Sequence, residues 1–156
     1  MAEGTGGWNA GAYGDDGWND GIVLSETGIA ATLALGNGGD TIKIALYTSS
    51  ASLDATTSAY TTSNEVSGTG YTAGGTTLSS QSVTLDSTNS VAFFDAADPS
   101  FTSATITARG ALIYNNSKSN AAIAVLDFGS DFSSSNGTFQ VQFPTAAHNT
   151  ALIRIS

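Results

Sequence analysis

The sequence predicts an all-β fold, an antiparallel β-sandwich preceded by an extended N-terminal arm. Ser, Thr and Gly together fill more than a third of the 156 positions. This composition favours strands and turns, because β-branched Thr fits a pleated surface and Gly is costly inside a helix. From residue 41 onward, short segments with two-residue alternation recur between turn signals. About eight such segments can be counted, the strand number of a jelly roll, so we expect one jelly-roll domain over residues 41–156.

Residues 1–40 form the predicted arm. The stretch Gly7-Trp8-Asn9-Ala10-Gly11 returns as Gly17-Trp18-Asn19-Asp20-Gly21, and Tyr13 lies between the two copies. Aromatic side chains are the usual anchors of protein interfaces. We therefore expect Trp8, Tyr13 and Trp18 to dock on a partner, with a disordered tail as the alternative. Apolar runs later in the arm predict one short strand or helical turn before the domain begins.

The first strands of the domain follow from apolar alternation. Every second residue is apolar in Thr41–Tyr47 and in Ser82–Asp86, so one face of each strand would be buried. The inward residues would be Ile42, Ile44, Leu46, Val83 and Leu85. The apolar segment Val91–Phe94 predicts a further strand, and Asp98-Pro99 marks a break after it.

Two longer strands are predicted at Ala104–Asn115 and Ala121–Phe128, joined by a polar connection of hairpin length. The run Ala122–Leu126 is apolar on both faces, so we expect it to lie centrally in the sandwich. A further hairpin is predicted at Asn136-Gly137, which can supply the two positive-φ residues of a type I′ turn. In the strands after it, Phe139, Val141 and Phe143 would face inward, Gln140 and Gln142 outward, Pro144 would end one strand, and Ala151–Ile155 would form the last.

Charge limits the partners. Thirteen acidic residues stand against four basic ones, for a formal net charge of −9. Phosphate backbones are bound by clustered Lys and Arg, so neither nucleic acid nor an anionic membrane is an expected partner, whereas a basic protein surface is. No apolar run approaches membrane-spanning length, and the first residues lack the basic and apolar regions of a secretory signal. We therefore expect synthesis in a cytoplasm.

Residue types that carry chemistry are sparse. The single histidine, His148, lies in a predicted surface loop, and no nucleophile elbow or phosphate-binding loop is present. Two carboxylate pairs occur, Asp95 with Asp98 and Asp127 with Asp131, and a two-carboxylate glycosidase is the catalytic alternative. Each pair sits where a strand enters a turn, so we interpret them as turn residues. Asp15, Asp16 and Asp20 lack the spacing of an EF-hand. Cysteine is absent. We expect no enzymatic activity, no cofactor and no metal.

The stretch from Lys43 to Ser49, the glycine-rich segment Asn64–Gly75 and the strand pair from Asp98 to Asn115 resemble small structural proteins of tailed bacteriophages. The Gly-Trp-Asn repeats are similar to N-terminal segments of cyanophage structural proteins. The resemblance implies a jelly-roll capsid cement or decoration protein, usually trimeric, on the outer surface of the virion. Its partners would be the major capsid protein and its own copies. Three arms would combine weak contacts through high effective concentration.

Two other classes of function stay open at this point. A tail-fibre or baseplate module would recognise a host carbohydrate by stacking exposed aromatic rings on sugar faces. A virion-associated glycan hydrolase would need one of the Asp pairs to be catalytic. Near Glu65–Gly75 we expect a shaped loop without a basic side chain beside it, and therefore no phosphate cradle.

Overall fold

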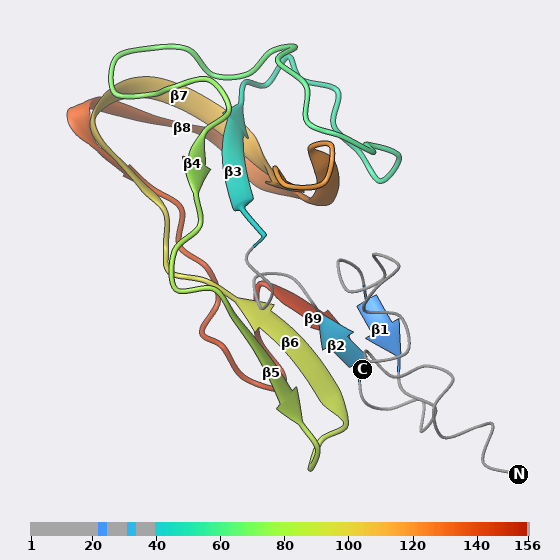
Figure 1. Cartoon of the computed structure of the whole chain (residues 1–156). Helices are drawn as coiled ribbons and strands as arrows, with labels where there is room; N and C mark the ends of the chain where they lie inside the picture. The colour runs from blue at the N-terminus through green and yellow to red at the C-terminus, as the bar shows by residue number, and fades with distance from the viewer. Residues whose placement is uncertain (1–21, 25–30, 34–39, 156) are drawn as a thin grey trace, which may run out of the picture. The chain divides into compact units, whose positions relative to one another are not determined.

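The computed structural model describes residues 22–24, 31–33 and 40–155 (Figure 1). All regular structure in these ranges is β-strand, and every strand pair is antiparallel. The all-β prediction is thereby confirmed. The chain divides into two compact units, one made of Thr41–Ser79 and Asp98–Gln142, the other of Met1–Asp40, Ser80–Ala97 and Phe143–Ser156. The jelly-roll arrangement and the single domain over residues 41–156 stay predictions.

The first unit contains a four-stranded sheet with the order β4-β3-β7-β8. Its strands are β3 (Ile42–Tyr47), β4 (Thr76–Thr77), β7 (Ser100–Asn115) and β8 (Ala121–Gln140). β7 and β8 form a long hairpin and run side by side in Figure 1. The turn between them occupies the polar segment predicted for it. The Asp98-Pro99 break is also confirmed, because it falls just before β7.

The interior strand β3 is buried on both faces. Ile42, Ile44 and Leu46 are fully buried, as the alternation predicts. Ala45 and Tyr47 point to the other face, where they pack with Leu112 and Tyr114 of β7. This second face is covered because Ala51, Leu53 and Tyr60, from the loop after β3, pack against it. A covered second face explains why the strand departs from the one-sided pattern of a solvated sheet.

The predicted hairpin at Asn136-Gly137 is wrong. β8 continues through these residues, and Gly137 pairs with Ala104 of β7. Asn136 does have a positive φ of 47°, but Gly137 is not among the positive-φ residues, and a type I′ turn needs both. Ala104 pairs with Gly137 and Ile106 with Ser134, so two residues of β8 oppose Thr105 alone. The positive φ therefore belongs to a β-bulge, in which the backbone N–H of Asn136 donates to Thr105 Oγ1 at 2.9 Å.

The prediction that Ala122–Leu126 lies centrally is also wrong. β8 is the last strand in the order of its sheet, and all five residues of this run are only partly buried. Farther along the chain, the predicted inward and outward directions of the side chains from Phe139 to Phe143 are confirmed. Phe139 and Val141 are buried, Phe143 is partly buried, and Gln140 and Gln142 are exposed, although β8 ends at Gln140 and not at Pro144.

The second unit contains the sheet β5-β6-β9, formed by β5 (Ser82–Asp86), β6 (Val91–Asp95) and β9 (Ile153–Ile155). Two short strands, β1 (Ile22–Leu24) and β2 (Ala31–Leu33), pair with each other in the predicted arm. The positions of β5, β6 and β9 match the prediction closely, whereas two paired strands stand where one short strand or helical turn was expected. The inward assignment of Leu85 is wrong, however, because this side chain is 50% exposed.

Candidate interaction surface

The loop between β3 and β4, residues 48–75, is organised around the carboxylate of Glu65. Glu65 Oε1 accepts hydrogen bonds from the Tyr71 hydroxyl and the Gly74 backbone N–H, both at 2.7 Å. Its Oε2 accepts one from the Tyr60 hydroxyl at 2.6 Å. Hydrogen bonds to an ionised acceptor are shorter and stronger than neutral ones. One carboxylate therefore connects three distant points of the loop.

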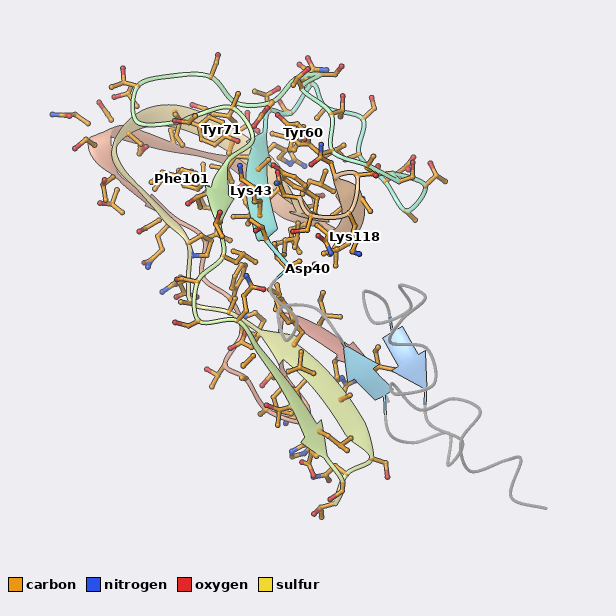
Figure 2. All side chains as sticks on the ribbon, viewed as in Figure 1. Asp40, Lys43, Tyr60, Tyr71, Phe101 and Lys118 are labelled. Carbon is orange, nitrogen blue, oxygen red and sulfur yellow. The ribbon has the colours of Figure 1, made fainter. Side chains whose placement is uncertain are left out.

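The same loop is tied to the sheet by tyrosine hydroxyls. Tyr71 accepts a hydrogen bond from the Leu46 N–H at 2.9 Å, and the Tyr114 hydroxyl donates to the Gly74 carbonyl at 2.8 Å. The rings of Tyr60 and Tyr114 stack with centroids 4.8 Å apart, and Tyr71 packs against Phe101. Figure 2 labels Tyr60, Tyr71 and Phe101 around β3. Polar and aromatic contacts together give this long loop a defined shape.

Burial alters the acidity of these hydroxyls. Desolvation raises the pKa of Tyr47 to about 12. Desolvation, followed by the hydrogen bond to the Glu65 carboxylate, also raises the pKa of Tyr60 and of Tyr71. A phenol that donates to a carboxylate cannot ionise without losing that bond and placing two negative charges together. The hydroxyls therefore act as neutral donors.

Glycines bring the loop against the sheet. A Cβ on Gly75, whose φ is +68°, would collide with the Ile44 carbonyl oxygen, and one on Gly70, with φ +77°, would lie 2.7 Å from Ala104 Cα. Side chains at these two positions would push the loop off the backbone beneath it. A Cβ on Gly74 would lie 3.3 Å from Lys43 Nζ. The expectation that no basic side chain lies near this segment is therefore wrong, since β3 brings Lys43 to it.

The shaped loop also contacts the start of β8. Its Tyr60 N–H donates to the Asn120 carbonyl, and the Ala122 N–H donates to the Ser58 carbonyl, both at 2.9 Å. Ala59 and Ala121 thereby form an isolated antiparallel bridge on the side of β8 that faces away from β7. Only this end of the outer edge is paired with the described part of the loop.

Two hollows flank the next residues of β8. One, of about 280 Å³, has a wall of loop residues that includes Thr48, Ala51 and Leu53, and it reaches Val125, Leu126 and Asp127 of β8. The other, of about 350 Å³, lies between the loop and β8 itself. It is lined by Asp54, Ala55, Thr57, Ala122, Ile123, Ala124 and Val125. Val125 borders both hollows, so they are adjacent, and together we call them the β8 edge surface.

Charge on the β8 edge surface is mainly acidic. The pKa of Asp54 is lowered by hydrogen bonds from the hydroxyl and N–H of Thr56. The pKa of Asp127 is lowered first by the Gly129 N–H and then by Arg109, whose Nε lies 3.2 Å from Asp127 Oδ1. The Arg109 and Asp127 side chains are both exposed, so their ion pair adds little to stability. Arg109 is the one basic residue among those that line the two hollows.

A second apolar feature lies farther along β8. Phe132 is 51% exposed, and its ring meets the edge of Phe128 with centroids 6.3 Å apart. Phe128 in turn packs against the buried Phe139. The sequence prediction missed Phe132 because it lies in a serine-rich segment, Ser130–Ser135, that has no apolar alternation.

The residues singled out for chemistry are dispersed. The prediction that Asp127 lies where a strand enters a turn is wrong, because β8 continues through it and its carboxylate accepts from the Gly129 N–H at an irregularity within the strand. Asp95 and Asp98 belong to different units. His148 is exposed, with Nδ1 3.9 Å from Asp86 Oδ2, a neighbour that the sequence did not reveal. Among the described residues, no three His, Asp or Glu side chains gather as metal ligands would, and no helix is long and apolar enough to span a membrane.

The predicted docking residues Trp8, Tyr13 and Trp18 and the acidic residues Asp15, Asp16 and Asp20 lie outside the described residues. Their roles stay predictions. Comparison with protein-family models, with curated proteins and with solved structures found no match to this chain. The functional argument therefore rests on the residues themselves.

Proposed function

We propose that this chain is a structural protein of a virus particle, a decoration protein that binds the major capsid protein and its own copies on the outer surface of the shell. The observation that carries the proposal is the β8 edge surface, where a half-buried apolar strand ends a sheet beside a loop held in shape by Glu65. Natural sheets normally protect such edges, because open edges pair with other chains. An apolar, open edge is therefore suited to assembly.

Two further features support a role on a shell. The net charge of −9 keeps a densely displayed protein soluble and favours a basic neighbour. The loop and the long hairpin form a stable scaffold in which Glu65 is used for internal hydrogen bonds and not for contact with a substrate. The resemblance to bacteriophage structural proteins implies a virus particle and a trimer, and a trimer would place three copies of the edge and of the arm on the shell together.

The direct test is co-sedimentation of the purified protein with mature capsids that lack it, with the native mass measured in parallel. Saturation of the capsids at a regular stoichiometry by a trimer is the expected result. A protein that stays in the supernatant at high concentration would remove the capsid assignment. A monomer that saturates the capsids would remove only the trimer.

The second candidate is a module of the adhesion apparatus that binds host carbohydrate, and the observation that favours it is Phe132. Phe132 is half exposed and packs against Phe128, so its ring offers an apolar surface on which a sugar ring could stack. This candidate predicts saccharide binding by the isolated protein and its loss in Phe132→Ala. Glycan-array binding that survives Phe132→Ala, or no binding at all, would count against it.

A further inference from the structure

We infer that the outer edge of β8, over Ile123–Leu126, is a strand-addition site that takes an extended, basic segment of the neighbouring shell protein. This inference rests on the proposed function, because it names the chemistry by which the shell would be bound. In strand addition, main-chain hydrogen bonds provide affinity and pockets for alternate side chains provide specificity. The outer edge of β8 meets both requirements, as its pairing and its hollow show.

The main-chain requirement is met by the position of β8. On one side its residues pair with β7, from Gly110 with Asp127 to Leu112 with Val125. On the other side, the described part of the loop reaches only Asn120–Ala122, through the hydrogen bonds to Ser58 and Tyr60. Beyond Ala122, β8 is the end of the sheet among the described strands. The loop bridge at Ala121 and the open stretch are separated by a β-bulge at Ile123, so an added strand would begin its regular pairing at Ala124.

The pocket requirement is met by the hollow of about 350 Å³ between Ala122–Val125 and the loop residues Asp54, Ala55 and Thr57. Neighbouring strands lie about 4.8 Å apart, so a strand added to β8 would occupy this hollow. Ala122 lies with Val125 on the face that the loop covers, and its short side chain leaves room there for a side chain of the incoming strand. A β-bulge at Ile123 places Ala124, which pairs with Ile113, on the opposite face. The partly buried Ile123 and Val125 supply apolar contact area.

Charge identifies the occupant as basic. Asp54 lies on the loop side of the site, and Asp127 follows directly after the open stretch. Arg109 neutralises Asp127 in part, but no basic side chain lines the hollow that contains Asp54. An incoming strand with Lys or Arg at its ends would place positive charge near both carboxylates. Complementary charge of this kind steers partners together and sets their register.

The same argument disfavours the chain's own segments. Residues 1–40 contain no Lys or Arg and six acidic residues, namely Glu3, Asp15, Asp16, Asp20, Glu26 and Asp40. A second copy that paired β8 with β8 would bring its own Asp127 and Asp131 to an edge that already carries carboxylates. Like charges that face each other across paired strands are destabilising. A different, basic chain therefore fits the edge best.

The test uses the full-length protein and two synthetic peptides with blocked ends, Lys-Val-Thr-Val-Thr-Val-Lys and its matched acidic form Glu-Val-Thr-Val-Thr-Val-Glu. Binding is measured by fluorescence anisotropy, and the site is located by backbone amide hydrogen exchange. The basic peptide should slow exchange within Ile123–Leu126 and should bind roughly tenfold or more tightly than the acidic one at low salt. Equal binding of both peptides, or protection located elsewhere, would overturn the inference.

Two variants of Ala124 with large side chains of opposite charge distinguish an effect of charge on binding from an effect of side-chain size. Ala124→Lys should weaken the basic peptide and shell co-sedimentation by roughly tenfold, because it places like charge on the edge, whereas Ala124→Glu should keep or strengthen both. The control is Ala146→Lys, the same change at an exposed position of the other unit. It should leave both readouts unchanged. If Ala124→Lys and Ala124→Glu weaken binding equally, the charge argument fails.

The two levels of proposal fail in different ways. If the wild-type protein sediments with shells and Ala124→Lys sediments equally well, the edge is not the site but the capsid function stands. If the wild-type protein does not sediment, the capsid function fails whatever the peptides do. A twofold native mass that Ala124→Lys reduces to that of one chain would show that a second copy occupies the edge, and would overturn the basic partner.

Discussion

At the scale of single residues, Glu65 decides the shape of the longest described loop. Its carboxylate accepts hydrogen bonds from Tyr60, Tyr71 and Gly74, which come from three parts of the loop. Nothing in the local sequence distinguishes Glu65 from a solvated acid. Its role depends on partners that only the folded chain brings together.

We expect Glu65→Ala to lower the free energy of unfolding by about 3 kcal/mol, because it leaves three partly buried donors without their acceptor. Glu65→Gln should cost less, about 1–2 kcal/mol, because one oxygen is retained. Urea unfolding followed by tyrosine fluorescence measures both. Asp131→Ala, at an exposed position, is the control and should be near neutral. Equal stability of Glu65→Ala and Asp131→Ala would contradict the assignment.

The tyrosines predict a loss of stability in alkali. Burial raises the pKa of Tyr47 from 10.0 to about 12, and that of Tyr71 moves in the same direction. A raised folded-state pKa means that the unfolded chain releases its protons first, so the unfolding free energy should be constant below about pH 10 and fall above it. Urea midpoints measured from pH 8 to 11.5 test this. Tyr71→Phe should show a shallower fall, and an unchanged slope would argue against Tyr71 as a source.

At the scale of elements, the sequence predicts where the strands lie along the chain better than it predicts which strands pair with each other. The alternation in Ile42–Tyr47 and in Ser82–Asp86 places both strands correctly. The apolar run Ala122–Leu126 misleads, because an apolar strand at an open edge has the same residue pattern as one in the middle of a sheet. Asn136-Gly137 misleads because long-range pairing with β7 overrides a local turn signal.

The loop that defines the β8 edge surface should depend on the absence of a side chain at Gly75. Gly75→Ala and Gly129→Ala both place Ala at a positive φ, +68° and +79°. Only the first also collides with the sheet, at the Ile44 carbonyl, while nothing lies within 4 Å of the second. Gly129→Ala should cost about 1 kcal/mol and Gly75→Ala at least about 2 kcal/mol more. Similar unfolding free energies for the two variants would show that the loop can move away.

At the scale of the whole molecule, the sequence predicts the all-β class but not the division into units. Segments Thr41–Ser79 and Asp98–Gln142 assemble into one unit although Ser80–Ala97 lies between them. The Asp98-Pro99 break marks one of these boundaries, but a break of this kind is equally expected between two strands of one domain. The proximity of Lys43 to Gly74 could not be predicted either. It arises because the loop of residues 48–75 folds back onto β3, and nothing in the local sequence indicates that contact.

The predicted N-terminal arm concerns the whole molecule, because changes in it should weaken binding to the shell without changing the stability of the fold. Trp8→Ala combined with Trp18→Ala should leave the unfolding midpoint unchanged and weaken co-sedimentation with shells by roughly tenfold or more, since truncation of aromatic anchors is costly at interfaces. Ser87→Ala with Ser133→Ala, two exposed positions, is the matched double control. Undiminished shell binding by the tryptophan variant would remove the arm from the mechanism.

The interleaving of the two units has a consequence for synthesis on the ribosome. The sheet β5-β6-β9 cannot be completed until Ile153–Ile155 has been made, because β6 pairs with β9. The unit that contains β3, β7 and β8 needs nothing beyond Gln142 and can form before Ile153–Ile155 leaves the exit tunnel. During that interval β5 and β6 can pair with each other, but the second edge of β6 lacks its partner β9. The chain thus acquires its assembly edge before it acquires its full fold.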